Sequence, residues 1–170
     1  MMLMVEMKEQ ECREALAHTS FGRLGCSLGD QPYIVPVCLA SEGDFIYVFA
    51  TLGKKIVWMR ANPKVCIQTD EIAGQSEWMS VIVNGHYEEL LEPHYASERK
   101  HARQLLEKRS QWWLNTFAER QLKLGDKLIE PIFFRICIDS ITGLRATDKI
   151  GDINAVNEKT ALAKSGVYTR

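Results

Sequence analysis

Apolar and polar positions alternate along most of the chain, a pattern typical of half-buried β-strands. Segments rich in aromatic and β-branched residues are predicted to form six strands, namely Phe21–Leu28, Tyr33–Ala40, Phe45–Ala50, Lys64–Thr69, Trp78–Leu91 and Ile132–Asp139. Turns containing glycine and aspartate follow the first two strands, so the first three form a meander. Gly85 is the expected bend of the fifth strand, and residues 141–146 continue the sixth after a bend.

Helical spacing is limited to three short segments, which are residues 7–18, 54–61 and 93–109. Residues 70–77 are expected to form a polar loop. Six strands joined mostly by short turns, with few helices, predict a small six-stranded antiparallel β-barrel with flanking helices, in the α+β class. We expect residues 1–148 to form this single domain and residues 149–170 to be a C-terminal tail or an arm on a partner subunit.

Pro36 interrupts the second predicted strand. Proline has no N–H to donate to a ladder, so this part of the strand is expected at an edge, a bulge or a gap in the sheet. One interpretation is a simple edge strand. The other is that a planar ligand lies beside the interrupted ladder and uses the backbone groups of Val35 and Val37.

A possible anion site lies where the third predicted strand ends and a helix begins, at Thr51, Gly53, Lys54 and Lys55. A helix N-terminus carries unpaired N–H groups and a partial positive charge. A hydroxyl, a residue without a Cβ and two ammonium groups beside it suit a phosphate monoester. The alternative is that the lysines are solvated and Gly53 only makes a turn. The segment is not a Walker A loop, because the spacer between glycines and the hydroxyl residue after lysine are missing.

Composition narrows the class of protein. The 170 residues are 46% apolar and 25% charged, which is typical of one globular domain. A net charge of −1 gives no general attraction to nucleic acid or to an anionic membrane. Five widely spaced cysteines without a C-x-x-C pair favour reduced thiols over a zinc or disulfide framework. No apolar run is long enough to span a membrane, so we expect a soluble cytoplasmic protein.

Short motifs occur in one order between residues 21 and 143: Phe21-Gly-Arg-Leu-Gly, Pro32-Tyr-Ile-Val-Pro-Val, Gly53-Lys-Lys, Arg60-Ala-Asn-Pro-Lys-Val-Cys, Trp78-Met-Ser-Val-Ile-Val-Asn-Gly and Phe134-Arg-Ile-x-Ile-Asp-x-Ile-Thr-Gly. The ordered set resembles the pyridoxamine 5′-phosphate oxidase-related, FMN-binding split-barrel family, and within it the nitroimidazole-resistance branch. No G-x-G-x-x-G motif follows any strand, which argues against a Rossmann domain.

The resemblance implies a six-stranded split barrel, a homodimer, and one FMN in each of two grooves between the subunits. It implies a set of flavin-binding residues: Thr51, Lys54 and Lys55 at the phosphate, Val35, Pro36 and Val37 along the isoalloxazine ring, and Ser80 as a polar contact. The pyridoxamine phosphate oxidases proper carry basic residues where this chain has Tyr33 and Cys38. This departure argues against pyridoxamine phosphate as the substrate.

Such a flavoprotein is expected to pass electrons from NADH or NADPH through FMN to a small acceptor, for example a nitro-aromatic, a quinone or oxygen. No residue is assigned as a catalytic acid or base. The alternatives are a flavin carrier without turnover of its own, a deazaflavin enzyme, and a haem-binding barrel with a histidine ligand. His94 and His101 are seven residues apart on one predicted helix, which is not a metal-binding spacing, so no metal site is expected.

Overall fold

The computed structural model describes residues 3–109 and 131–147. Its helices and strands follow one another as β1 (Leu3–Glu6), α1 (Glu9–His18), β2 (Phe21–Leu28), β3 (Gln31–Glu42), β4 (Phe45–Ala50), α2 (Lys54–Ala61), β5 (Lys64–Gly74), β6 (Glu77–Glu89), α3 (Ala96–Glu107) and β7 (Ile132–Thr147). The predicted tail lies outside the described residues, so the division of the chain at residue 148 stays a prediction.

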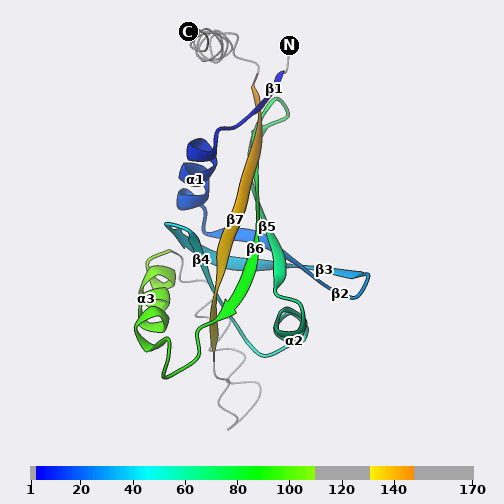
Figure 1. Ribbon diagram of the computed structural model, residues 1–170. Helices are drawn as coiled ribbons and strands as arrows, with labels where there is room; N and C mark the ends of the chain where they lie inside the picture. Colours follow the sequence, from blue (N-terminus) through cyan, green and yellow to red (C-terminus); the bar gives the residue numbers. More distant parts are fainter. Residues whose placement is uncertain (1–2, 110–130, 148–170) are drawn as a thin grey trace, which may run out of the picture.

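The strands form one antiparallel sheet that closes on itself (Figure 1). Neighbouring strands follow the order β1-β7-β4-β3-β2-β5-β6, and β6 also pairs with β7. The pairing of β6 with β7 closes a ring of six strands, β2, β3, β4, β5, β6 and β7. β1 lies outside this ring and pairs with β7. The predicted six-stranded split barrel is confirmed, and β1 is an additional strand that the sequence pattern did not indicate.

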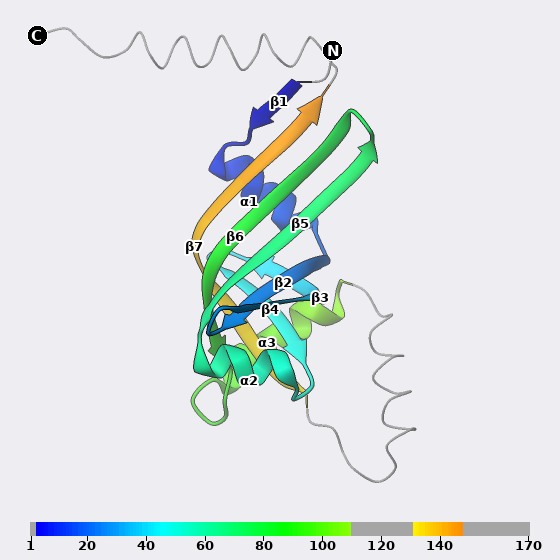
Figure 2. The same cartoon turned by 90° about the vertical axis from the view of Figure 1, so that its right-hand side faces the viewer.

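β7 is long enough to pair with two different strands along the same edge. Its first part pairs with β4, from Ile132 to Cys137, and its last part pairs with β1, from Leu144 to Thr147. Its other side pairs with β6 between Phe134 and Ala146. The sheet therefore continues beyond the barrel as an extension made of β1, β7, β6 and β5, which Figure 2 shows rising above the short strands β2 and β4.

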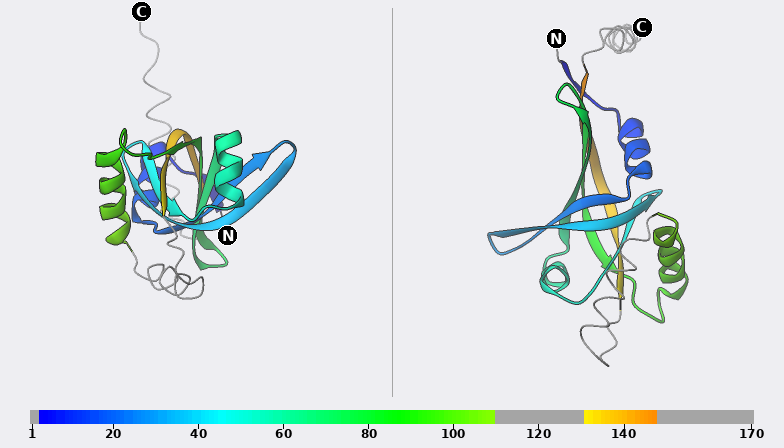
Figure 3. Two further views of the ribbon diagram at one scale, coloured as in Figure 1. Left: turned by 90° about the horizontal axis from the view of Figure 1, so that it is seen from below. Right: turned by 180° about the vertical axis from the view of Figure 1, so that it is seen from behind.

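Alternation in the strands separates a core face from an outer face. Apolar side chains fill the barrel from inside, among them Leu24, Leu39, Ile67, Val83 and Phe134, each with 0% of its surface exposed. Burial of such residues is the main favourable contribution to folding. α2 contributes Ile56 and Met59 to this same core. On the opposite face of the sheet, α3 covers a second cluster around Ala40, Tyr47 and Phe133, so the two helices lie on opposite sides of the barrel (Figure 3).

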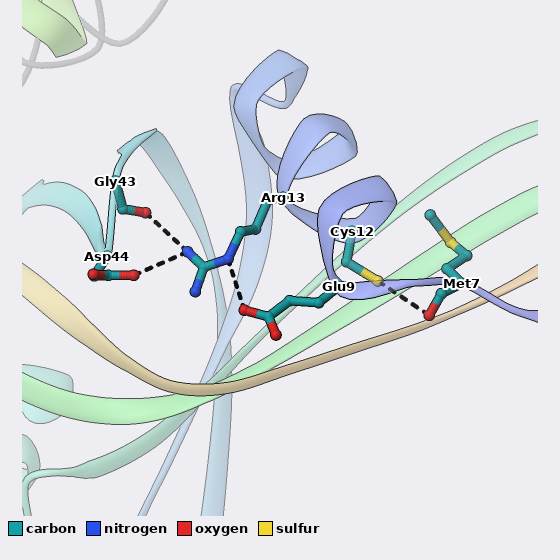
Figure 4. A network of polar contacts seen from close by, with 6 residues as sticks. All are labelled: Met7, Glu9, Cys12, Arg13, Gly43 and Asp44. Carbon is teal, nitrogen blue, oxygen red and sulfur yellow. Dashed lines mark hydrogen bonds and ion pairs between the residues drawn. The ribbon is translucent and has the colours of Figure 1, made fainter. Parts of the chain in front are cut away.

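Polar contacts of Arg13 fix α1 to the turn between β3 and β4 (Figure 4). The guanidinium donates to Glu9 at 2.9 Å, to Asp44 at 3.0 Å and to the Gly43 carbonyl at 3.2 Å. Gly43 has a φ of 57°, a left-handed conformation that favours glycine in this turn. α1 thus packs on the sheet with Cys12 and Leu16 buried.

Two sequence predictions are wrong at the level of elements. Residues 70–77 are not a polar loop, because β5 runs to Gly74 and β6 starts at Glu77, leaving a tight hairpin. The third helix starts at Ala96 and not at Pro93. His94 therefore precedes α3 and does not share a helix face with His101. The bend predicted at Gly85 is confirmed by a shift of register between Asn84 and Gly85.

Candidate functional site

The first half of β3 has an open edge. β4 pairs only with Leu39 to Glu42, so within the described residues the part from Gln31 to Cys38 has a strand neighbour, β2, on one side alone. Pro36 lies in this part, as expected for a residue without an N–H.

The register fixes which backbone groups of β3 face that open edge. The Leu39 N–H donates to the Ser20 carbonyl at 3.1 Å, and backbone groups of an antiparallel strand alternate in direction. The groups of Val35 and Val37 therefore point toward β2. Those of the residues between them, including the Pro36 carbonyl, point toward the open side. A ligand beside this edge would meet the Pro36 carbonyl. The prediction that it would use the backbone groups of Val35 and Val37 is wrong, because these groups face β2, and the two side chains pack in or against the barrel core.

The start of α2 lies next to this edge and is rich in donors. The first helical hydrogen bond runs from the Val57 N–H to the Gly53 carbonyl at 3.1 Å, so the amides of residues 54–56 precede the helical pattern. The first turn contains no acidic residue. Gly53 is extended, with a φ of 178°, and Thr51 before it is half-buried. The arrangement offers backbone amides, a hydroxyl and two ammonium groups without a competing carboxylate in the turn.

Aromatic rings hold the Lys54 side chain in place. Its Nζ lies 4.7 Å from the ring centroid of Tyr33 and 4.4 Å from that of Trp58, within the range of cation–π attraction. The two rings contact each other edge-on, with centroids 5.6 Å apart. Because Tyr33 belongs to β3 and Trp58 to α2, the cluster connects the open edge to the helix start. Burial raises the pKa of the nearby Cys26 thiol, and the charges of Lys54 and Lys55 oppose this rise.

Ser80 belongs to a second polar group, on the outer face of β2, β5 and β6. The Gln68 Nε2 donates to the Ser80 hydroxyl at 3.1 Å and to Asp70 at 3.2 Å. Arg23 donates to the Gln68 Oε1 at 3.1 Å and forms an ion pair with Asp70. The four side chains make one continuous network across three strands.

Two adjoining grooves meet at this network. One has a volume of about 640 Å³ and is lined by Trp78, Ser80, Ile82 and Leu144, among others. The other has a volume of about 400 Å³, and its lining includes Arg23, Gln68 and Asp70 as well as Trp78 and Ser80. An apolar wall with a few convergent polar groups suits a planar, partly polar ligand.

The predicted site residues thus form two separate groups. Lys54, Lys55 and Thr51 lie at the start of α2, beside the strand that carries Pro36. Ser80 pairs across the sheet with Leu144, in the extension where β7 meets β1. Ser80 accepts a hydrogen bond from Gln68 of β5, whereas α2 packs mainly against β2. A single chain supplies both groups but does not bring them together.

Two of the four histidines contact carboxylates. His86 contacts Asp139 at 3.1 Å, and His101 contacts Glu42 at 2.6 Å. No cluster of histidine, cysteine or acidic side chains suited to a metal ion occurs in residues 3–109 and 131–147. In the same ranges, no helix is long and apolar enough to cross a membrane.

Sequence reasoning missed several residues of both groups. Tyr33 was noted only as a departure from the resembled enzymes, and Trp58 only as part of a helix. Arg23, Gln68 and Asp70 were not singled out. The register of β2, β5 and β6 brings Arg23 opposite Gln68 and Asp70 opposite Ser80. Arg23, Gln68 and Ser80 lie on predicted strands, whereas Asp70 was assigned to a loop. Only knowledge of which strands pair could have joined the four residues.

Comparison with known proteins identifies the family. The family model described as pyridoxamine 5′-phosphate oxidase matches residues 8–145. An uncharacterized protein of Rhizobium meliloti is 40% identical over 141 residues, 82% of this chain and 93% of that protein. An FAD-binding protein of Mesorhizobium loti is 36% identical, with a TM-score of 0.71 over 87% of this chain and 100% of that one. A candidate 5-nitroimidazole antibiotic resistance protein of Bacteroides thetaiotaomicron has the same fold, with a TM-score of 0.61 at 17% identity over 88% of this chain and 93% of that one.

The family match covers most of the chain, and all the motifs that carried the resemblance lie inside it, between residues 21 and 143. The resemblance is therefore confirmed. The chain belongs to the pyridoxamine 5′-phosphate oxidase-like family of split-barrel proteins.

Proposed function

We propose that this protein binds FMN and acts as an oxidoreductase that passes electrons from NADH or NADPH to a small acceptor. The observation that carries the proposal is the donor-rich start of α2 beside the open edge of β3. Backbone amides at a helix start, the Thr51 hydroxyl and the two lysines suit a dianionic phosphate. The first turn of α2 contains no acidic residue that would repel the phosphate.

The flavin supplies the redox chemistry when it is bound, by accepting and donating electrons at its ring. The protein's own part is to bind, orient and shield. Lys54 and Lys55 hold the phosphate end, with Lys54 kept near by Tyr33 and Trp58. The edge of β3 at Pro36 lies along the ring. Ser80 donates a hydrogen bond to the ring from the outer-face network.

The two separate groups are explained by a homodimer with a flavin at each interface. One subunit then supplies the start of α2, and its partner supplies the groove at Ser80. The outer face favours such an assembly, because α3 covers only part of it. The rest carries exposed large apolar residues: Met4 64%, Phe21 43%, Ile34 68%, Ile72 71%, Ile82 44% and Leu144 44% exposed. An apolar surface of this kind marks an interaction site.

FAD is a second candidate cofactor. The similar protein from Mesorhizobium loti is described as FAD-binding, and it is matched over its whole length. The same donors would take the pyrophosphate of FAD. A flavin carrier without turnover of its own is the other alternative. It would have the same flavin-binding residues, but it would not oxidise NADH or NADPH.

The absorption spectrum of the purified protein tests the proposal directly. We expect the two bands of an oxidised flavin, and heating should release FMN rather than FAD. Bleaching of the bands by NADH or NADPH, followed by recovery on adding a nitro-aromatic or quinone, supports the oxidoreductase over the carrier. A Soret band, or a colourless protein that takes up neither FMN nor FAD, contradicts flavin binding.

The phosphate site has its own test. We expect the double variant Lys54→Ala and Lys55→Ala to bind FMN about a hundredfold more weakly, because two charge-assisted hydrogen bonds of roughly 3 kcal/mol together are lost. Riboflavin, which has no phosphate, should bind almost as it does to the unchanged protein. Fluorescence titration of both ligands measures this, with Lys64→Ala as the control lysine at the start of β5. Equal losses for both ligands would show that the lysines do not hold the phosphate.

A further inference from the structure

The orientation of the Gln68 side-chain amide follows from its neighbours. Arg23 can only donate hydrogen bonds, so the Gln68 atom that faces it at 3.1 Å must be the carbonyl oxygen Oε1. The ionised Asp70 carboxylate can only accept, so the atom that faces it at 3.2 Å must be the amide nitrogen Nε2. The two neighbours agree, and the amide cannot be reversed without losing both contacts.

The amide orientation in turn sets the role of Ser80. The same Nε2 lies 3.1 Å from the Ser80 Oγ and donates to it. A hydroxyl oxygen that accepts in this way keeps its own proton for another partner. The contact with Gln68 uses only the oxygen of the Ser80 hydroxyl and leaves its proton for a second contact. Ser80 also lines both grooves, so its proton is available to a ligand there.

We propose that Gln68 is a positioning residue that, held by Arg23 and Asp70, makes Ser80 a hydrogen-bond donor to the flavin ring. The inference rests on the proposed function, because it needs a flavin in the groove. It assigns a role to Gln68 and Asp70 of β5, which the family motifs did not include, and to Arg23 of β2, which lies inside one of them. If Gln68 loses its amide, the Ser80 proton is free to turn toward the Asp70 carboxylate, its cross-strand neighbour.

A donor at the ring has a measurable effect on the flavin. Hydrogen bonds to a more negative acceptor are stronger, so the Ser80 donor binds the reduced ring more tightly than the oxidised ring. Removing the donor should weaken the binding of the reduced flavin about tenfold relative to the oxidised flavin. For a two-electron couple, that ratio corresponds to a midpoint potential lower by about 30 mV.

The test uses four forms of the protein: unchanged, Gln68→Met, Ser80→Ala and the double variant. Each is stripped of cofactor and titrated with FMN and with FAD, and the midpoint potential of the bound flavin is measured against reference dyes. We expect both single variants to lower the potential by a similar amount. The double variant should show no further decrease, because Gln68 acts only through Ser80. Gln10→Met, on the exposed face of α1, is the matched control and should leave the potential unchanged.

The outcomes separate the inference from the function on which it rests. If the unchanged protein binds neither FMN nor FAD, the proposed function itself fails. If flavin binds but Gln68→Met leaves the potential unchanged, or lowers it further in the Ser80→Ala background, the positioning role is wrong. Gln68 is only half-buried, and thermal unfolding of each variant checks that the protein is folded before the potential is measured.

Discussion

Gly85 shows how a single residue can set the path of a strand. A Cβ at this position would lie 2.3 Å from the Cys137 carbonyl oxygen and 2.8 Å from the Ile136 Cγ2. The register of β6 against β7 shifts at this point, and the closeness of the two backbones permits no side chain.

We therefore expect Gly85→Ala to lower the free energy of unfolding by about 1–3 kcal/mol, since backbone must move to admit the methyl group. Urea unfolding followed by circular dichroism measures the change. Gly74→Ala, where an added Cβ meets nothing within 4 Å, is the matched control and should have a small effect. Equal stability of Gly85→Ala and the unchanged protein would show that the backbone of β7 can move away at this point without cost.

The residues at the start of α2 could be found from the sequence because they are neighbours in it. Strand, glycine turn and helix are consecutive, so Thr51, Lys54 and Lys55 were predicted together. The contact of Lys54 with the Tyr33 and Trp58 rings could not be predicted in the same way. Tyr33 lies 21 residues earlier, and its contact depends on how β3 packs against α2. Residue patterns reveal local chemistry, whereas the groups that complete a site arrive through tertiary packing.

At the scale of elements, α2 is held at its far end by an ion pair. Arg60 donates to Glu89 of β6 through two nitrogens, at 2.8 and 2.7 Å, and the Tyr87 hydroxyl donates to the same carboxylate at 2.6 Å. The hydrogen bonds from Arg60 are the main cause of a lowered Glu89 pKa. The carboxylate is nearly buried, with 11% of its side chain exposed.

This contact predicts a dependence of stability on pH. A carboxyl group whose pKa is lower in the folded state stabilises the protein above its unfolded pKa, about 4.3 for glutamate, and loses this effect as the pH falls through the folded pKa. Glu89→Gln should therefore reduce stability by roughly 1–3 kcal/mol at neutral pH. The difference from the unchanged protein should shrink below about pH 4.

Urea unfolding at a series of pH values checks this expectation. Glu14→Gln serves as the control, because Glu14 is exposed on α1 and contacts Gln10 of the same helix. A difference between Glu89→Gln and the unchanged protein that stays constant down to pH 3 would mean that the ion pair does not depend on the charge of Glu89.

Most elements followed from alternation and turn residues, and the exceptions have a physical cause. β1 was missed because it is a short strand whose partner among the described strands, the end of β7, lies about 140 residues away in the chain. The segment 70–77 was taken for a loop because it contains acidic and small residues. Its strand character comes from pairing, as Glu71 lies opposite Met79 and Ile72 opposite Trp78 in the hairpin. Non-local pairing overrides weak local propensity.

At the scale of the whole molecule, the uncovered outer face predicts self-association. Ile82 lies in the middle of β6, opposite Gln68 and Thr142, and it lines the larger groove. We expect Ile82→Lys to convert a dimer to a monomer, because a desolvated charge would face an apolar surface. In the proposed dimer each flavin site is shared between two subunits, so flavin binding should decrease in this variant as well.

Sedimentation velocity of the two proteins, with and without FMN, measures this change. Leu91→Lys is the matched control: Leu91 is 55% exposed in the segment between β6 and α3, outside both groups of site residues, and the variant should remain dimeric. A dimeric Ile82→Lys, or a monomeric unchanged protein that still binds FMN tightly, contradicts the proposed assembly.

β7 also determines when the barrel can form. It is the last described strand, and it supplies the only described partners of β1 and the second neighbours of β4 and β6. On the ribosome, every earlier described strand is made before this one, so the ring stays open until β7 has been made. Until then the edges of three strands are unpaired and able to join another chain. The order of synthesis thus leaves the nascent protein dependent on rapid completion, or on chaperones, to avoid aggregation.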